Sequence, residues 1–157
     1  MHSSIHLPLP TNFEESMTYL NSLNVIERVE EGPVVFFNRP VNDLEFQEIS
    51  SKLFSIHRYE YNLIRQREQR VFGRALASQA IDLAGAKNLE LIDSGVQVDI
   101  VQVATALGKI QALLESGAIG IASDICKLYK SNFQTHLEIF ELVISEVDNF
   151  RTQRGYK

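Results

Sequence analysis

The segment with the most evident chemical potential is "HRYEYNLIRQREQRVFGR", from His57 to Arg74. Five arginines stand against two glutamates, Glu60 and Glu68, so the local charge is 5 − 2 = +3. The arginines are Arg58, Arg65, Arg67, Arg70 and Arg74, and Tyr59 and Tyr61 lie among the first of them. A guanidinium group binds phosphate through a fork of donors, and a tyrosine ring can stack on a base. These residues are therefore a candidate nucleic-acid contact.

Two other interpretations fit the same segment. The one we favour is a solvated helix face on which glutamates and arginines pair. The other is a row of arginines, Arg67, Arg70 and Arg74, that meets acidic residues of an adjacent subunit, such as those between Glu138 and Asp148. The net charge of −5 argues against a surface that coats nucleic acid generally. Nucleic acid is thus an alternative partner and not the favoured one.

Catalytic and metal-binding motifs are absent from the sequence. It holds no glycine-rich phosphate loop, no GxSxG turn and no paired CxxC motif. The single cysteine, Cys126, lies on an apolar helical pattern, so we expect a small buried side chain and not a nucleophile. His57 and Glu60 have the i, i+3 spacing of a metal-ligand pair, but His136 with Glu141 supplies no matching set. We expect no enzyme, no cofactor and no metal.

Composition is typical of a soluble globular protein, with 157 residues, 45% apolar and 22% charged. The start, "MHSSIHLPLPTNFEES", lacks the basic residues and long apolar run of a signal peptide. One cysteine cannot form an intrachain disulfide, which favours a reducing compartment. These features predict an intracellular protein.

The most apolar stretch, Ile100 to Ser123, is predicted to be helical core. Lys109 and Glu115 would be costly in the hydrocarbon of a bilayer, so we expect no membrane span. Apolar residues from Ile100 to Leu114 follow the spacing of one packed seam, and Ser116-Gly117 ends it.

Two further helices are expected after this break. One carries apolar residues from Ala118 to Tyr129, and the next begins at Thr135, which has capping-box spacing to Glu138. Residues from about 96 to 152 are therefore predicted to form a three-helix unit. The first of its helices has a broad apolar arc, which packing within the chain explains best and a subunit interface would also explain.

The N-terminal region is predicted to contain an arm, a helix and a hairpin. Pro8 and Pro10 make residues 1–10 an extended arm, and Thr11 with Glu14 has capping-box spacing for a short helix. β-branched and aromatic residues on both sides of Gly32-Pro33 predict a hairpin at about 24–38. A lone hairpin is marginal in water, so it must pack on helices or on a second subunit.

A long helix is predicted from about 43 to 84, capped by Asn42 or Asp43. Two alternatives stay open: one helix kinked near Gly73, which we prefer, or two helices in tandem. A loop is expected to follow Ala84 and to end at Ser94-Gly95.

The C-terminal third carries a resemblance. "KIQALLESGAIGIASD", followed by "HLEIFELVISEVDNF", resembles small helical proteins that tailed bacteriophages encode for virion assembly. The resemblance implies a structural or assembly subunit, a virion location if the chain is phage-encoded, and no catalytic residues.

The expected fold is mainly α: a helical bundle with one long helix, a C-terminal three-helix unit and a small N-terminal β-hairpin. After the arm at 1–10, residues 11–157 are expected to form one domain. The expected function is a non-enzymatic assembly protein that forms a homo-oligomer and contacts other assembly proteins. The alternative is a nucleic-acid-binding or regulatory module that uses Arg58 to Arg74. The predicted oligomer contacts are Leu7, Leu9, Val34, Val35, Phe36 and Phe37.

Overall fold

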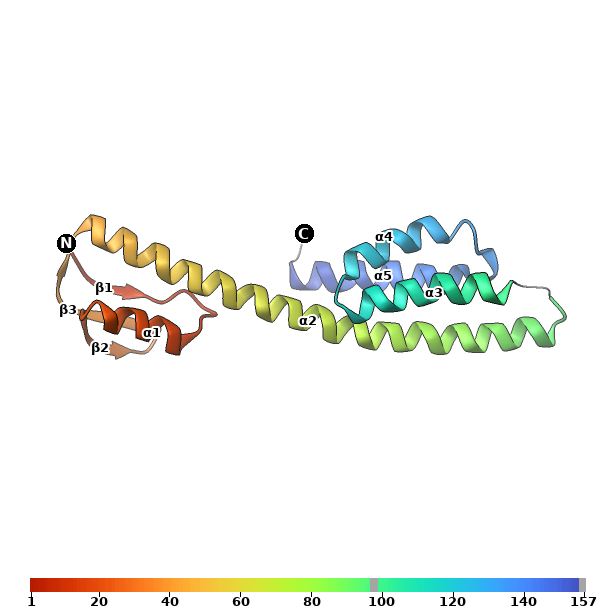
Figure 1. Cartoon of the computed structure of the whole chain (residues 1–157), viewed down its shortest axis with the longest axis horizontal. Helices are drawn as coiled ribbons and strands as arrows, with labels where there is room; N and C mark the ends of the chain where they lie inside the picture. The colour runs from red at the N-terminus through yellow and green to blue at the C-terminus, as the bar shows by residue number, and fades with distance from the viewer. Residues whose placement is uncertain (97–98, 156–157) are drawn as a thin grey trace. The chain divides into compact units, whose positions relative to one another are not determined.

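The computed structural model describes residues 1–96 and 99–155 (Figure 1). Its elements are β1 (His2–His6), α1 (Phe13–Ser22), β2 (Ile26–Glu30), β3 (Val34–Val41), α2 (Asp43–Asp93), α3 (Ile100–Glu115), α4 (Ile119–Tyr129), the 3-10 turn η1 (Gln134–His136) and α5 (Leu137–Arg154). The mainly helical fold, with one long helix and a small N-terminal sheet, is confirmed. None of the helices within these ranges has the length and apolar character that crossing a membrane requires.

The chain divides into two compact units where one domain after an arm was expected. Unit 1 is Met1–Arg65 and unit 2 is Gln66–Lys157, and α2 contributes residues to both. Each unit has its own apolar core, and no residue belongs to both cores.

Unit 1 contains a three-stranded antiparallel sheet of order β1-β3-β2. The predicted hairpin is present as β2 and β3, but residues 2–6 of the expected arm form strand β1 against β3. Residues 2–6 form a strand and not an arm because they pair with β3. Ile5 lies opposite Val35, and both side chains are buried. Leu20 of α1 and Ile49 and Leu53 of α2 pack on the same apolar face of the sheet.

Polar contacts fix the ends of the unit 1 elements. Asn12, not Thr11, caps α1, since its Oδ1 accepts from the amide of Glu15 at 3.0 Å. The Thr11 hydroxyl instead lies 3.1 Å from that of Ser16.

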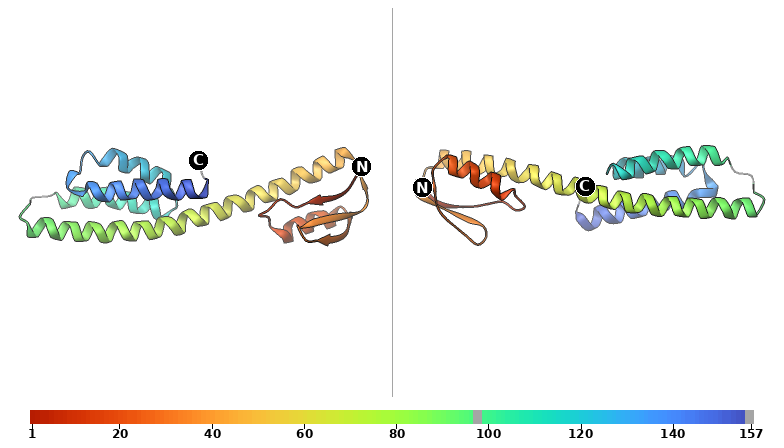
Figure 2. Two further views of the ribbon diagram at one scale, coloured as in Figure 1. Left: turned by 180° about the vertical axis from the view of Figure 1, so that it is seen from behind. Right: turned by 60° about the horizontal axis from the view of Figure 1, so that its bottom comes forward.

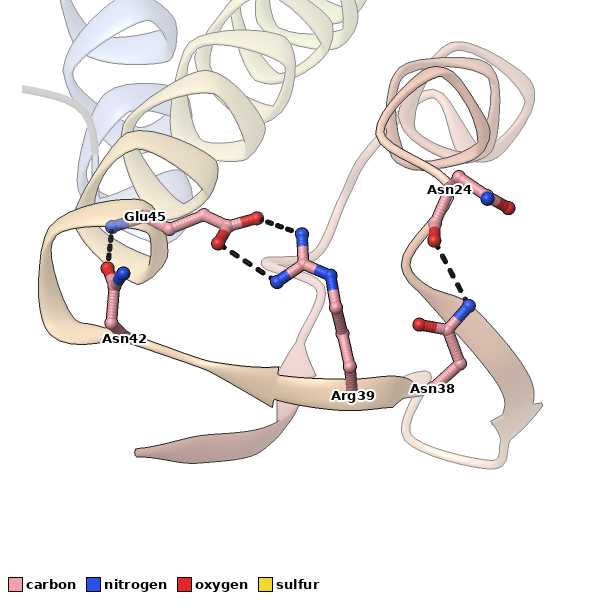
Figure 3. Close-up of polar contacts among 5 residues, drawn as sticks. All are labelled: Asn24, Asn38, Arg39, Asn42 and Glu45. Carbon is pink, nitrogen blue, oxygen red and sulfur yellow. Dashed lines mark hydrogen bonds and ion pairs between the residues drawn. The ribbon is translucent and has the colours of Figure 1, made fainter.

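Polar contacts hold the junction of β3 with α2 and the turn before β2 (Figure 3). Of the two predicted caps, Asn42 caps α2 by accepting from the amide of Glu45 at 2.8 Å. Arg39 donates two hydrogen bonds to the Glu45 carboxylate, at 2.6 and 3.1 Å, and this contact lowers the pKa of Glu45. Asn38 Nδ2 donates to the carbonyl of Asn24, whose φ of 54° closes the turn before β2.

Helix α2 is one continuous helix, and it extends nine residues beyond the predicted end at Ala84. The predicted loop is helical because its inward positions are also packed. Ala84 and Leu91 are buried, and Asn88 Oδ1 accepts from His136 Nε2 at 2.7 Å. The tandem-helix alternative is thus excluded.

Unit 2 consists of the second part of α2 with α3, α4 and α5 (Figure 2). Phe140 and Leu114 are fully buried in its core, which also contains Leu76, Ile110 and Val143. The break at Ser116-Gly117 is confirmed, and Gly117 has a φ of +88°, which side chains disfavour. Helix α5 starts at Leu137 and not at Thr135, because Thr135 bonds the ring of His136 at 2.8 Å instead of capping the helix.

Candidate functional site

An open groove of about 600 Å³ lies beside strand β1 in unit 1. Ile5, His6 and Pro8 form one wall, and the α2 residues Phe46, Ser50, Ser51, Leu53 and Phe54 form the other. Consecutive residues of a strand point to opposite faces of its sheet. Because Ile5 and His6 both line the groove, it runs along the edge of β1 and not over one face.

A histidine contact bounds the groove at each end. His2 stacks on Phe46 with ring centroids 3.8 Å apart, and its Nε2 lies 2.9 Å from Asp43 Oδ1. At the other end His57 Nδ1 donates to the carbonyl of Pro10 at 2.6 Å. From Phe46 to His57 the helix rises about 16 Å, which equals the length of about five residues of extended chain.

The backbone of β1 presents hydrogen-bonding groups to the groove side. Leu7 donates to the carbonyl of Pro33 at 3.0 Å, and Ile5 lies opposite Val35. Backbone groups of an antiparallel strand alternate in direction, so those of Ser4 and His6 point away from β3. With β1 at the end of the strand order, they have no strand partner on that side.

The two edges of the sheet differ in charge. Edge strand β2 carries Glu27, Arg28 and Glu30, and Arg28 pairs with both glutamates at 2.8 and 3.0 Å. Charges of this kind protect an edge against pairing with another chain. Strand β1, "HSSIH", has no acidic residue, lysine or arginine. It is therefore the edge of the sheet that an added strand can reach.

Three of the six predicted oligomer contacts belong to the core of unit 1. Leu7, Val35 and Phe37 are buried, so they are not available to a second copy. Val34 and Phe36 are half-buried on the other face of β3, where the Arg28 guanidinium lies 4.1 Å from the Phe36 ring centroid. Among the six, only Leu9 is exposed, with 61% of its surface accessible.

Four of the residues predicted to contact nucleic acid or a second subunit lie in unit 1, on the last turns of α2 up to Arg65. Arg58, Tyr59 and Tyr61 are exposed, and Arg65 is half-buried. The ring of Tyr61 is 6.2 Å from that of His57, so it flanks the end of the groove.

The three arginines predicted to form a stripe lie at one end of unit 2, and all are exposed. The stem of Arg70 packs closely on Gly117, where an added Cβ would lie 2.8 Å from Arg70 Cγ. Glu68 pairs with Arg154 of α5 at 3.2 Å, a contact between helices that the sequence did not indicate. Arg67, Arg70 and Arg74 have no ion-pair partner within residues 1–96 and 99–155.

Two side chains of unit 2 that could act as a nucleophile or a base, Cys126 and His136, are buried. Cys126 is fully buried, as predicted, and burial raises the pKa of its thiol to about 12. His136 is buried between Thr135 and Asn88, and burial, followed by the charge of Lys87, lowers its pKa. The described part of the chain has no cluster of three histidine, cysteine or carboxylate side chains that could hold a metal.

Comparison with protein-family models, with curated proteins and with solved structures found no match to this chain. Function is therefore inferred from the geometry of the chain itself. The groove was not predicted from the sequence, although Pro8 and the exposed Phe54 on an otherwise polar helix face belong to it.

Proposed function

We propose that the chain is a non-enzymatic assembly protein that forms a homo-oligomer through the free edge of β1. The observation that supports this proposal is an uncharged edge strand beside an apolar groove, in a sheet whose other edge is charged. A strand that adds to such an edge gains main-chain hydrogen bonds, and the groove receives its side chains.

A second copy of β1 fits this edge. Two antiparallel copies related by a twofold axis through Ile5 place Ser4 of each opposite His6 of the other. The outward backbone groups of both strands are then satisfied by the same contact, which is the self-complementarity that a symmetric dimer requires. Leu9, exposed beyond the strand, lies where it can contact the second copy.

Replacing Ser4 with proline tests the β1 contact. The Ser4 N–H points to the free edge, so proline removes no hydrogen bond within the chain, and extended backbone accommodates its φ. It does remove a donor from the proposed pairing. We expect the wild type to be at least dimeric by light scattering, Ser4→Pro to lose that contact with an unchanged circular dichroism spectrum, and Ser4→Ala to keep it.

Two results would contradict the proposal. A wild-type monomer would exclude self-association and leave the groove to an extended segment of another protein. An unchanged mass of folded Ser4→Pro would exclude β1 as the contact. The resemblance of the C-terminal third to virion-assembly proteins and the virion location both stay predictions.

A further inference from the structure

Unit 2 carries opposite charges at its two ends. We define the tip as residues 87–96 and 99–101, where α2 ends and α3 begins, and the base as residues 66–74, 115–120 and 148–155. Arg70 and Asp93 lie about 35 Å apart along α2, because each residue adds about 1.5 Å. This distance exceeds the roughly 8–10 Å over which salt screens charges, so the two ends do not neutralise one another.

The base is positive. It holds five arginines against three acidic residues, so its formal charge is 5 − 3 = +2. These are Arg67, Arg70, Arg74, Arg151 and Arg154, with Glu68, Glu115 and Asp148. Helix α4 also begins here without a side-chain cap. Gly117, just before the helix, lies against Arg70, and Gly120, in its first turn, lies against Arg151.

The tip is negative and apolar. Glu90, Asp93 and Asp99 stand against Lys87, which gives 1 − 3 = −2. Glu138 lies beside Lys87 and Glu90. Asp93 is the last residue of α2, whose last turn has no basic residue, so its carboxylate lies at the negative end of the helix dipole. Leu89, Ile92 and Val101 are 64, 56 and 76% exposed beside these carboxylates.

We infer that the tip of unit 2 binds the base of unit 2 of a second copy, head to tail. The two ends carry net charges of opposite sign, so the tip of one copy attracts the base of another. Val71, 64% exposed between the arginines of the base, supplies an apolar surface for the leucine and isoleucine of the tip. A head-to-tail contact does not close on itself in a dimer, so it extends assemblies into chains or rings.

This inference rests on the proposed self-association but uses a different contact. The β1 contact is made by backbone groups and gives a dimer. The tip–base contact is made by charges, so it is weakened by salt and links dimers into larger species.

A charge-exchange experiment on the full chain tests it. The tip variant is Glu90→Lys with Asp93→Lys, and the base variant is Arg67→Glu with Arg74→Glu. Each variant by itself has ends of like charge, which repel one another. We therefore expect its mean mass in solution at low salt to be about two-fold or more below that of the wild type. In an equimolar mixture of the two variants, each end of one variant meets an end of opposite charge on the other. The mean mass of the mixture is therefore expected to recover.

The matched control is Asp82→Lys with Glu141→Lys, two exposed positions away from both ends. We expect this control variant to keep the wild-type mass.

Several results would overturn the tip–base contact. Unchanged mass of either variant, or no recovery in the mixture of two folded variants, overturns the tip–base contact. Loss of binding to a single-stranded oligonucleotide in the base variant, with its mass unchanged, would assign the arginines to nucleic acid and also overturn it. If the β1 proposal alone fails, the variants are monomers and the mixture still associates. If this inference alone fails, the wild type stops at the dimer at every salt concentration.

Discussion

At Gly73 the backbone of α2 touches the backbone of the α3 C-terminus. A Cβ atom there would overlap the carbonyl oxygen and carbon of Leu114, and neither can rotate away. The sequence suggested a kink at this glycine, but its role is to let two backbones approach closely. Such a position tolerates no side chain unless the helices separate.

Gly73→Ala is expected to destabilise the protein by at least about 2 kcal/mol, because an overpacked core must shift its backbone. Gly85→Ala is the matched control on the same helix, since an added Cβ there meets no atom within 4 Å. It is expected to stabilise by about 0.5–1 kcal/mol through helix propensity alone. Urea unfolding of both variants measures the difference, and equal midpoints would rule out the close contact.

Helix α2 shows how element boundaries depend on partners that are distant in sequence. The segment "AGAKNLELIDSG" was predicted to be a loop that ends at Ser94-Gly95. Asn88 instead pairs with the His136 ring 48 residues later, and the helix continues to Asp93. Strand β1 was missed for the same reason, since Ser3-Ser4 has no apolar alternation and the strand exists only through β3.

Several patterns carried by local sequence were predicted correctly, although the capping-box residues Thr11 and Thr135 do not cap their helices. The apolar seam from Ile100 to Leu114, the break at Ser116-Gly117 and the Asn42 cap all have a local physical cause, and all are present. The groove could not be predicted, because its walls come from β1 and α2, and their proximity follows from sheet order and not from any motif.

The Asn88–His136 contact makes the C-terminal part of α2 sensitive to pH. Burial, and then Lys87, lowers the pKa of His136, so the folded state favours the neutral ring. As pH falls, the unfolded chain takes up the proton first. The contribution to stability is therefore complete above the ordinary histidine pKa of about 6.5 and is lost as pH falls below it.

We expect the urea midpoint to decrease between about pH 7 and pH 5, and to decrease less in His136→Gln. Glutamine can still donate to Asn88, so the variant removes the titration and keeps a hydrogen-bond donor. Replacing the exposed His6 with glutamine is the control. A pH dependence that is the same in His136→Gln and in the wild type would exclude His136 as its source.

On the scale of the whole molecule, two separate cores are joined by one helix. Leu20 belongs to the core of unit 1 and Leu114 to that of unit 2, and both are fully buried. Because no side chain belongs to both cores, loss of packing in one removes no apolar contact from the other. A continuous backbone alone transmits little stability, since most helical stability in proteins comes from packing of the apolar face.

Leu20→Ala and Leu114→Ala are therefore a matched pair, each expected to cost about 2–5 kcal/mol in its own unit. Native-state hydrogen exchange measured by mass spectrometry should show lost amide protection in α1 and the sheet for the first variant, and in α3 to α5 for the second. Helix α2 should lose protection on the side of the altered core only. Equal loss throughout the chain in both variants would show that the units unfold as one, and would require coupling through α2 that its packing does not provide.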